Sequence, residues 1–87
     1  MTIKTLNFAA GQEMMKDSPL AMAVQKAGEY ESSIYISNGK MRANAKSLMG
    51  MMTMEVDPAE PVVITAEGPD EEEAASALAN YLVSQIG

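Results

Sequence analysis

The chain of 87 residues contains no cysteine, no histidine and no tryptophan. Without cysteine it has no disulfide, no thiol nucleophile and no thiolate metal site, and this composition fits a reducing compartment. Without histidine it also lacks the imidazole that most often completes a metal site. We therefore expect neither a metal centre nor a bound cofactor.

Positive charge and long apolar runs are scarce as well. Six basic residues face twelve acidic ones, and the net charge of −6 argues against nucleic acid or an anionic membrane as a partner. No apolar run approaches the roughly 18 residues of a membrane span. Residues 2–8 alternate apolar and polar side chains, unlike a signal peptide. The sequence predicts one cytoplasmic domain over residues 1–87.

What is present is an orderly alternation of strand and helix patterns. A Ser18-Pro19 pair predicts a helix start, because serine caps a helix and proline fits its first position. The predicted elements are a strand over 3–8, a helix from Ser18 that Gly28 ends near Tyr30, strands over 33–37 and 40–45, a short helix from Ser47 to about Met54, a strand over 62–66 and a final helix capped by Asp70.

Asn38-Gly39 is the strongest turn signal in the chain, since both positions of a tight hairpin turn tolerate positive φ. The predicted inward-facing side chains are those of Leu6, Phe8, Val24, Ile34, Ile36, Val63, Leu78 and Leu82. Four strands with three helices on one face bury these side chains most economically. The predicted fold class is α+β: an open-faced β-sandwich with a four-stranded antiparallel sheet and the order βαββαβα.

Short motifs spread over nearly the whole chain resemble one known family. They are Pro19, Asn38-Gly39-Lys40, Lys46-Ser47 followed by Leu48-Met49-Gly50-Met51-Met52, and Gly68-Pro69-Asp70-Glu71. In this order they resemble the histidine-containing phosphocarrier (HPr) family of the sugar phosphotransferase system, and in particular its catabolite-repression paralogue, which lacks the histidine. The resemblance implies the same βαββαβα fold and a protein that is not an enzyme.

The chain departs from the family at the active centre. Lys16 stands where the phospho-accepting histidine would be, Ser18 replaces the arginine that steadies the phosphoryl group, and only Pro19 remains. An imidazole with a pKa of about 6.5 has a free nitrogen at neutral pH, whereas an ammonium of pKa about 10.4 has no lone pair to offer. Phosphoryl carriage from the system's first enzyme to its sugar permeases is therefore excluded on chemical grounds.

Ser47 carries the sharpest functional hypothesis. The resemblance makes it the target of HPr kinase/phosphorylase, and phosphate is well placed at a helix start. The ordinary alternative is that Ser47 only caps its helix, as most such serines do.

The methionines, nine in all, cannot all point inward where four of them fall within residues 49–54. Some must be exposed, and an exposed methionine patch suits an adaptable protein-binding surface. The resemblance implies that Leu20, Leu48, Met49 and Met52 contact a transcriptional regulator of carbon catabolism. Core filling is the plainer alternative, and Cu(I) binding by thioethers is disfavoured because no histidine or cysteine completes a site.

Two other charged clusters have ordinary explanations. Acidic residues in 70–73 suit the first turn of a helix, and Lys16-Asp17-Ser18 lacks flanking groups that would activate a lysine nucleophile. Two functions stay open: a regulatory protein switched by phosphorylation at Ser47, and a protein-interaction module or degenerate paralogue that is never phosphorylated. A monomer and a strand-swapped dimer also stay open.

Overall fold

The computed structural model describes residues 1–6, 18–53 and 59–86 of the chain. Its elements are β1 (Thr2–Leu6), α1 (Ser18–Ala27), β2 (Ser33–Asn38), β3 (Met41–Asn44), α2 (Leu48–Thr53), β4 (Val62–Glu67) and α3 (Glu71–Ile86). Each predicted element is present, with ends that differ by a residue or two. Phe8, Met54 and the loop with Lys16 lie outside the described residues.

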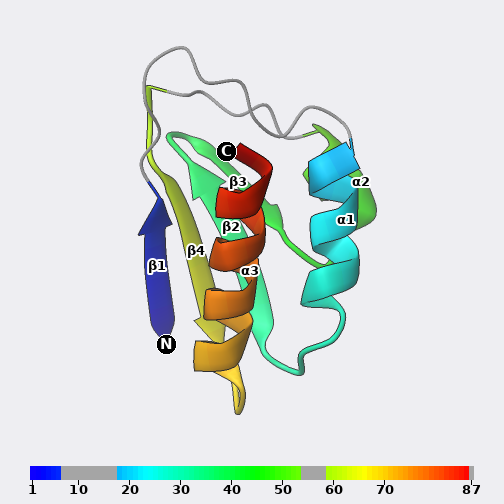
Figure 1. The fold of residues 1–87 in the computed structure, drawn as a ribbon, viewed down its shortest axis with the longest axis vertical. Coiled ribbons are helices and arrows are strands. Elements are labelled where there is room, and N and C mark those ends of the chain that lie inside the picture. Colours follow the sequence, from blue (N-terminus) through cyan, green and yellow to red (C-terminus); the bar gives the residue numbers. More distant parts are fainter. Residues whose placement is uncertain (7–17, 54–58, 87) are drawn as a thin grey trace.

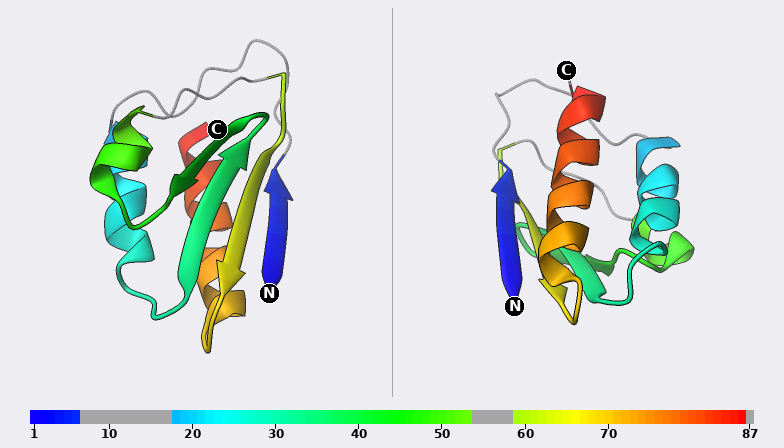
Figure 2. Two further views of the ribbon diagram at one scale, coloured as in Figure 1. Left: turned by 180° about the vertical axis from the view of Figure 1, so that it is seen from behind. Right: turned by 60° about the horizontal axis from the view of Figure 1, so that its bottom comes forward.

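The strands form one antiparallel sheet in the order β1-β4-β2-β3. In Figure 1 α3 lies in front of the sheet, with α1 and α2 to its side, and from behind the strands face the viewer with no helix over them (Figure 2, left). The predicted open-faced α+β sandwich is therefore confirmed. No helix within the described ranges is long and apolar enough to cross a membrane.

The core lies between the sheet and the helices. Its fully buried large side chains include Ile34, Ile36, Met51, Val62, Ile64, Leu78 and Leu82. Leu6 and Val24 are only partly buried against this core. The prediction that Val63 points inward was wrong: Val62, Ile64 and Ala66 are buried, and Val63 faces the other side of the sheet. The register causes this, because Ile64 pairs with Ile36 and Ala66 with Ile34.

The β2–β3 turn is shifted by one residue from the prediction. Asn38 pairs with Met41, so Gly39 and Lys40 form the turn, and Gly39 has a φ of 58°. Asn38 is instead a buried strand residue whose side-chain amide donates to the carbonyls of Glu60 (3.1 Å) and Pro61 (3.2 Å). It holds the segment before β4 against the end of β2.

Candidate functional site

The segment between β3 and α2 places Ser47. The Asn44 side-chain oxygen accepts the amide of Lys46 at 2.9 Å, and the Asn44 carbonyl accepts the amide of Ser47 at 2.9 Å. The amide of Ala45 donates to the carbonyl of Ile34 at 2.8 Å, which ties this turn to the start of β2. Ser47 is therefore fixed by local bonds at the end of the sheet.

Ser47 occupies the cap of α2 as predicted. Its Oγ accepts the amide of Gly50 at 3.2 Å, and its carbonyl accepts the amide of Met51 at 2.9 Å. A side-chain oxygen that accepts the third helical amide satisfies one of the donors that every helix start leaves unpaired. A Cβ at position 50 would lie 3.3 Å from the Ser47 Oγ, so Gly50 also leaves room beside the hydroxyl. The Ser47 side chain is half-buried.

Lys46 joins the start of α2 to the segment that follows α1. Its Nζ donates to the Tyr30 carbonyl at 2.6 Å. Helices α1 and α2 also contact each other and lie side by side in Figure 1 and Figure 2. Sequence reasoning missed this contact, because the two residues lie 16 positions apart and no local pattern links them.

The apolar residues of α2 divide between the core and the surface. Met51 is fully buried, whereas Leu48, Met49 and Met52 are 47%, 77% and 65% exposed. We call these three exposed side chains the α2 apolar face. The expectation that some of these methionines are exposed is confirmed. Met22, half-exposed on α1, was not singled out from the sequence, although a methionine at a polar phase of that helix was the available signal.

The side chains of the other predicted site residues, which lie near the start of α1, are outside the described part of the structure. Ser18 and Pro19 begin α1 and Leu20 follows in its first turn, but their side chains are not among those described. Lys16 lies outside the described residues. The proposed partner contact of Leu20 and the degenerate centre at Lys16 therefore stay predictions.

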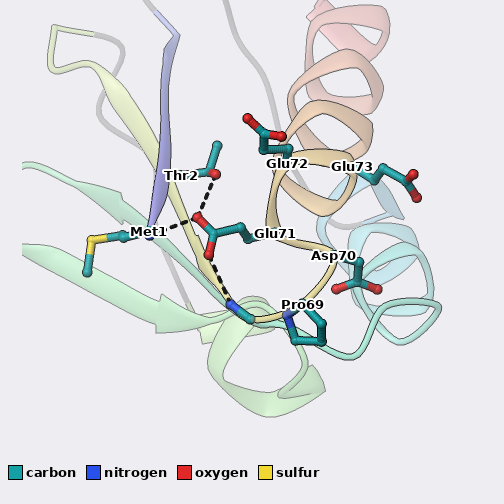
Figure 3. Close-up of a pocket in the computed structure, with 8 residues that line it drawn as sticks. Met1, Thr2, Pro69, Asp70, Glu71, Glu72 and Glu73 are labelled. Carbon is teal, nitrogen blue, oxygen red and sulfur yellow. Dashed lines mark hydrogen bonds and ion pairs between the residues drawn. The ribbon is translucent and has the colours of Figure 1, made fainter.

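A second cluster of polar groups lies where α3 begins. Met1, Thr2 and residues 68–73 line a pocket there (Figure 3). One Glu71 oxygen accepts the Thr2 hydroxyl at 2.7 Å and pairs with the Met1 ammonium at 2.8 Å, and the other accepts the Gly68 amide at 3.3 Å. These donors, the ammonium first, lower the pKa of Glu71 from 4.5 to about 2, and Glu71 in turn raises the pKa of the ammonium.

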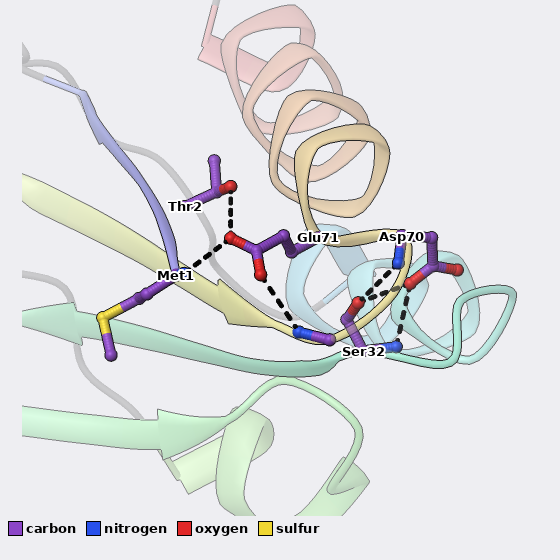
Figure 4. A network of polar contacts seen from close by, with 6 residues as sticks. Met1, Thr2, Ser32, Asp70 and Glu71 are labelled. Atoms are coloured by element: carbon purple, nitrogen blue, oxygen red, sulfur yellow. Dashed lines mark hydrogen bonds and ion pairs between the residues drawn. The ribbon is translucent and has the colours of Figure 1, made fainter.

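Asp70 uses its carboxylate across the fold rather than along its own helix. It accepts the amide of Glu31 at 3.0 Å and both the amide (2.9 Å) and the hydroxyl of the buried Ser32 (Figure 4). The Asp70 amide donates back to the Ser32 hydroxyl at 3.2 Å. These bonds, the Ser32 hydroxyl foremost, hold the pKa of Asp70 below its ordinary value. The predicted cap is present in the backbone, since the Asp70 carbonyl accepts the amide of Ala74 at 2.9 Å.

The carboxylates of Asp70 and Glu71 are thus occupied by structural bonds. Within the described ranges, no group of three or more acidic side chains is placed to hold a metal ion. Glu71 attaches β1 to α3, and Asp70 attaches α3 to the segment that enters β2. The polar groups at this end of the fold therefore have a structural role, which is to join these segments. The Ser47 Oγ, by contrast, accepts a local bond from the Gly50 amide, and the exposed side chains of the α2 apolar face follow it in the sequence.

The comparisons with known proteins agree with this fold. The family model described as PTS HPr component phosphorylation site matches residues 5–84. The chain belongs to the HPr family. The HPr-like protein Crh of Bacillus subtilis (strain 168) is 35% identical over 68 residues, which cover 78% of this chain and 80% of Crh. The phosphocarrier protein HPr of Borreliella burgdorferi is 41% identical over 66 residues, 76% of this chain and 77% of that protein.

Solved structures of the family are similar throughout. HPr-C-His from Thermoanaerobacter tengcongensis has a TM-score of 0.83 and 34% identity, covering 100% of this chain and 97% of its own. Crystalline Crh of Bacillus subtilis, described as a swapped dimer, has a TM-score of 0.72 and 30% identity over 91% of each chain. The resemblance to HPr and to its catabolite-repression relative is confirmed.

Proposed function

We propose that this chain is a regulatory, non-catalytic HPr protein that is phosphorylated on Ser47. The proposal rests mainly on the position of Ser47: it caps α2, its Oγ makes one local bond to Gly50, and the α2 apolar face follows it directly. We also propose that residues 1–87 form a single HPr-like domain that works in the cytoplasm.

The start of α2 favours a phosphoserine for electrostatic reasons. A phosphate adds close to two negative charges at neutral pH. The first amides of a helix are donors without a partner in the helix, and the helix dipole is positive at this end. The first turn of α2 holds no acidic residue that would repel the new charge. Phosphorylation therefore changes the surface charge here without a need to unfold the helix.

A phosphate on Ser47 would lie beside the α2 apolar face. We propose that this combination binds a transcriptional regulator of carbon catabolism. An arginine of that regulator would pair with the phosphate, while Leu48 and Met52 fill an apolar pocket of the same partner. The similarity to Crh supports this assignment.

Phosphoryl carriage does not belong to the proposal. The chain contains no histidine, and Lys16 stands at the acceptor position. An ammonium group offers no lone pair to a phosphoryl donor at neutral pH. The regulatory serine is then the only family phosphorylation site that this sequence retains.

The direct test is the intact mass of the protein after incubation with HPr kinase/phosphorylase and ATP. We expect the gain of one phosphate, which Ser47→Ala abolishes. Ser33→Ala is the matched control, because Ser33 is an exposed serine on β2, and this variant should be phosphorylated like the parent. Ser47→Ala should lower the free energy of unfolding by about 1 kcal/mol, which is the usual cost of losing a serine cap. No mass gain in the parent, or an equal gain in Ser47→Ala, would contradict the assignment.

Binding to the regulator gives a second test. The phosphorylated form should bind more tightly than the unmodified form, and its affinity should fall more steeply with salt because a charge pair is screened. Met52→Ala should weaken binding of both forms by removing an apolar contact.

The second candidate is an interaction module that is never phosphorylated. The exposure of Leu48, Met49 and Met52 favours it, because this apolar surface exists without a phosphate. Equal affinity of both forms for the regulator would select this candidate.

A further inference from the structure

Three methionine side chains of one short helix experience opposite environments. Met49 and Met52 are 77% and 65% exposed, and Met51, between them in the sequence, is fully buried. Met51 belongs to the core with Ile34, Ile36 and Leu78. Within this helix of six residues, two thioether groups are therefore exposed to solvent and one is buried.

The composition of the chain directs oxidation to the sulfur atoms of its methionines. The chain has no cysteine, no tryptophan and no histidine. Methionine is then the most readily oxidised side chain that the protein has, since thiols would otherwise react first. Solvent exposure decides which of the described methionines react. Met1, Met22 and Met41 are exposed as well. Met49 and Met52, however, are the ones that belong to the α2 apolar face.

We propose that Met49 and Met52, which follow Ser47 on the surface of α2, form a reversible oxidation site whose product weakens docking of HPr kinase/phosphorylase at the α2 apolar face. In each case the oxidant is hydrogen peroxide. The thioether sulfur gives an electron pair to one peroxide oxygen, the O–O bond breaks, and the departing hydroxide takes the proton of the sulfur-bound oxygen to form water. Sulfur is oxidised by two electrons and the peroxide is reduced by two. Methionine sulfoxide reductases reverse the change.

The position of the two side chains lets the modification act at the surface without damage to the fold. A sulfoxide is polar and destabilises a protein when it forms in the core, but the side chains of Met49 and Met52 are mostly exposed. Their oxidation instead replaces apolar contact surface by a strong dipole beside Ser47. The effect on docking rests on the proposed function, whereas the selectivity of the oxidation does not.

The first experiment maps the sulfoxides. The full chain is treated with increasing hydrogen peroxide and each methionine is quantified by peptide mass spectrometry. Met49 and Met52 should react more than about ten times faster than Met51, which requires local unfolding to be reached. In strong urea the three rates should become equal. Met51 reacting as fast as its neighbours in the folded protein would overturn the proposal, as would a lack of reaction at Met49 and Met52.

The second experiment measures the consequence. Phosphorylation of Ser47 by HPr kinase/phosphorylase is compared between the oxidised and the reduced form of each protein. Oxidation should lower the phosphorylation rate of the parent protein several-fold, and treatment with methionine sulfoxide reductases A and B should restore it. For the Met49→Leu/Met52→Leu double variant, the oxidised and the reduced form should be phosphorylated at nearly the same rate. Met41→Leu, which removes an exposed methionine on β3, should keep the parental loss.

Two results separate the possible failures. An unchanged rate after verified oxidation of Met49 and Met52 would overturn the docking consequence while the proposed function stands. A reduced protein that the kinase does not phosphorylate at all would overturn the proposed function together with that consequence. The mapped selectivity is decided independently of both.

Discussion

Gly68, between β4 and α3, gives the sharpest test of how the fold is held together. It has a φ of 151°, which side-chain-bearing residues rarely adopt. A Cβ at this position would lie 2.6 Å from the Ser32 Oγ, 2.9 Å from the Ser32 Cβ and 2.7 Å from the Ser32 Cα. Gly68→Ala therefore combines a strained backbone with a clash against the start of β2.

The expected cost of Gly68→Ala follows from these two parts. A backbone held in a region reserved for glycine costs about 1–3 kcal/mol, and overpacking of a tight contact costs about 1–3 kcal/mol more. The sum of about 2–6 kcal/mol is a large share of the roughly 4–13 kcal/mol that holds a chain of 87 residues folded. Displacement of Ser32 would also disturb its bonds to Asp70.

Urea unfolding followed by circular dichroism measures this cost. The matched control is Gly28→Ala, whose Cβ would meet only the Val24 and Gln25 carbonyl oxygens at 3.5 Å, an ordinary contact. That control should change the free energy of unfolding by less than about 0.5 kcal/mol. In a Ser32→Gly background, Gly68→Ala should keep more than half of its cost, because the Ser32 Cα remains. If Gly68→Ala matched Gly28→Ala, the argument from the Ser32 contact would be refuted.

Three further predictions address the core, the ion pair of Glu71 and the absence of phosphoryl carriage. Leu78→Ala should cost about 2–5 kcal/mol because Leu78 is fully buried, while Val83→Ala, half-exposed on the same helix, should cost far less, both by urea unfolding. The lowered pKa of Glu71 means that its contribution to stability is complete above about pH 4.5 and is lost as the pH falls to about 2; the urea midpoint of Glu71→Gln should thus lie below that of the parent at pH 7 and meet it near pH 2, with the exposed Glu72→Gln as control. Incubation with phosphoenolpyruvate and the first enzyme of the phosphotransferase system should leave the mass unchanged, since Lys16 replaces the acceptor; an acid-labile gain of one phosphate would contradict this.

The parts of the fold that the sequence predicted are those governed by local patterns. Alternation in β2 and helical spacing in α3 correctly placed Ile34, Ile36, Leu78 and Leu82 in the core. The start of α2 was predictable because a capping serine bonds an amide only three residues away, at Gly50.

The errors occur where the local pattern is ambiguous. Residues 62–64 are all β-branched, so their sequence does not say which of them point inward, and the pairing with β2 decides in favour of Val62. Asn38 was assigned to the turn because Asn-Gly suits one. Its side-chain amide instead bonds the carbonyls at 60 and 61, which lie more than 20 residues away, and the turn moves on to Gly39 and Lys40.

Ser47 and Asp70 show what the sequence could not predict about two helix caps, which is the set of distant partners that each one has. Both residues precede a helix, and both were predicted as caps. Asp70 accepts three hydrogen bonds from Glu31 and Ser32, 38 or more residues earlier in the chain, and these occupy its carboxylate. The Ser47 Oγ accepts one bond, from the Gly50 amide of its own helix, and this half-buried residue is followed by exposed apolar side chains. A modification of Asp70 would break bonds that join distant segments, whereas the proposed phosphate on Ser47 would displace one local bond of its Oγ. The tertiary contacts therefore make the Asp70 cap part of the link between α3 and the start of β2, whereas the Ser47 Oγ is bonded within its own helix, and the proposed phosphorylation rests on this difference.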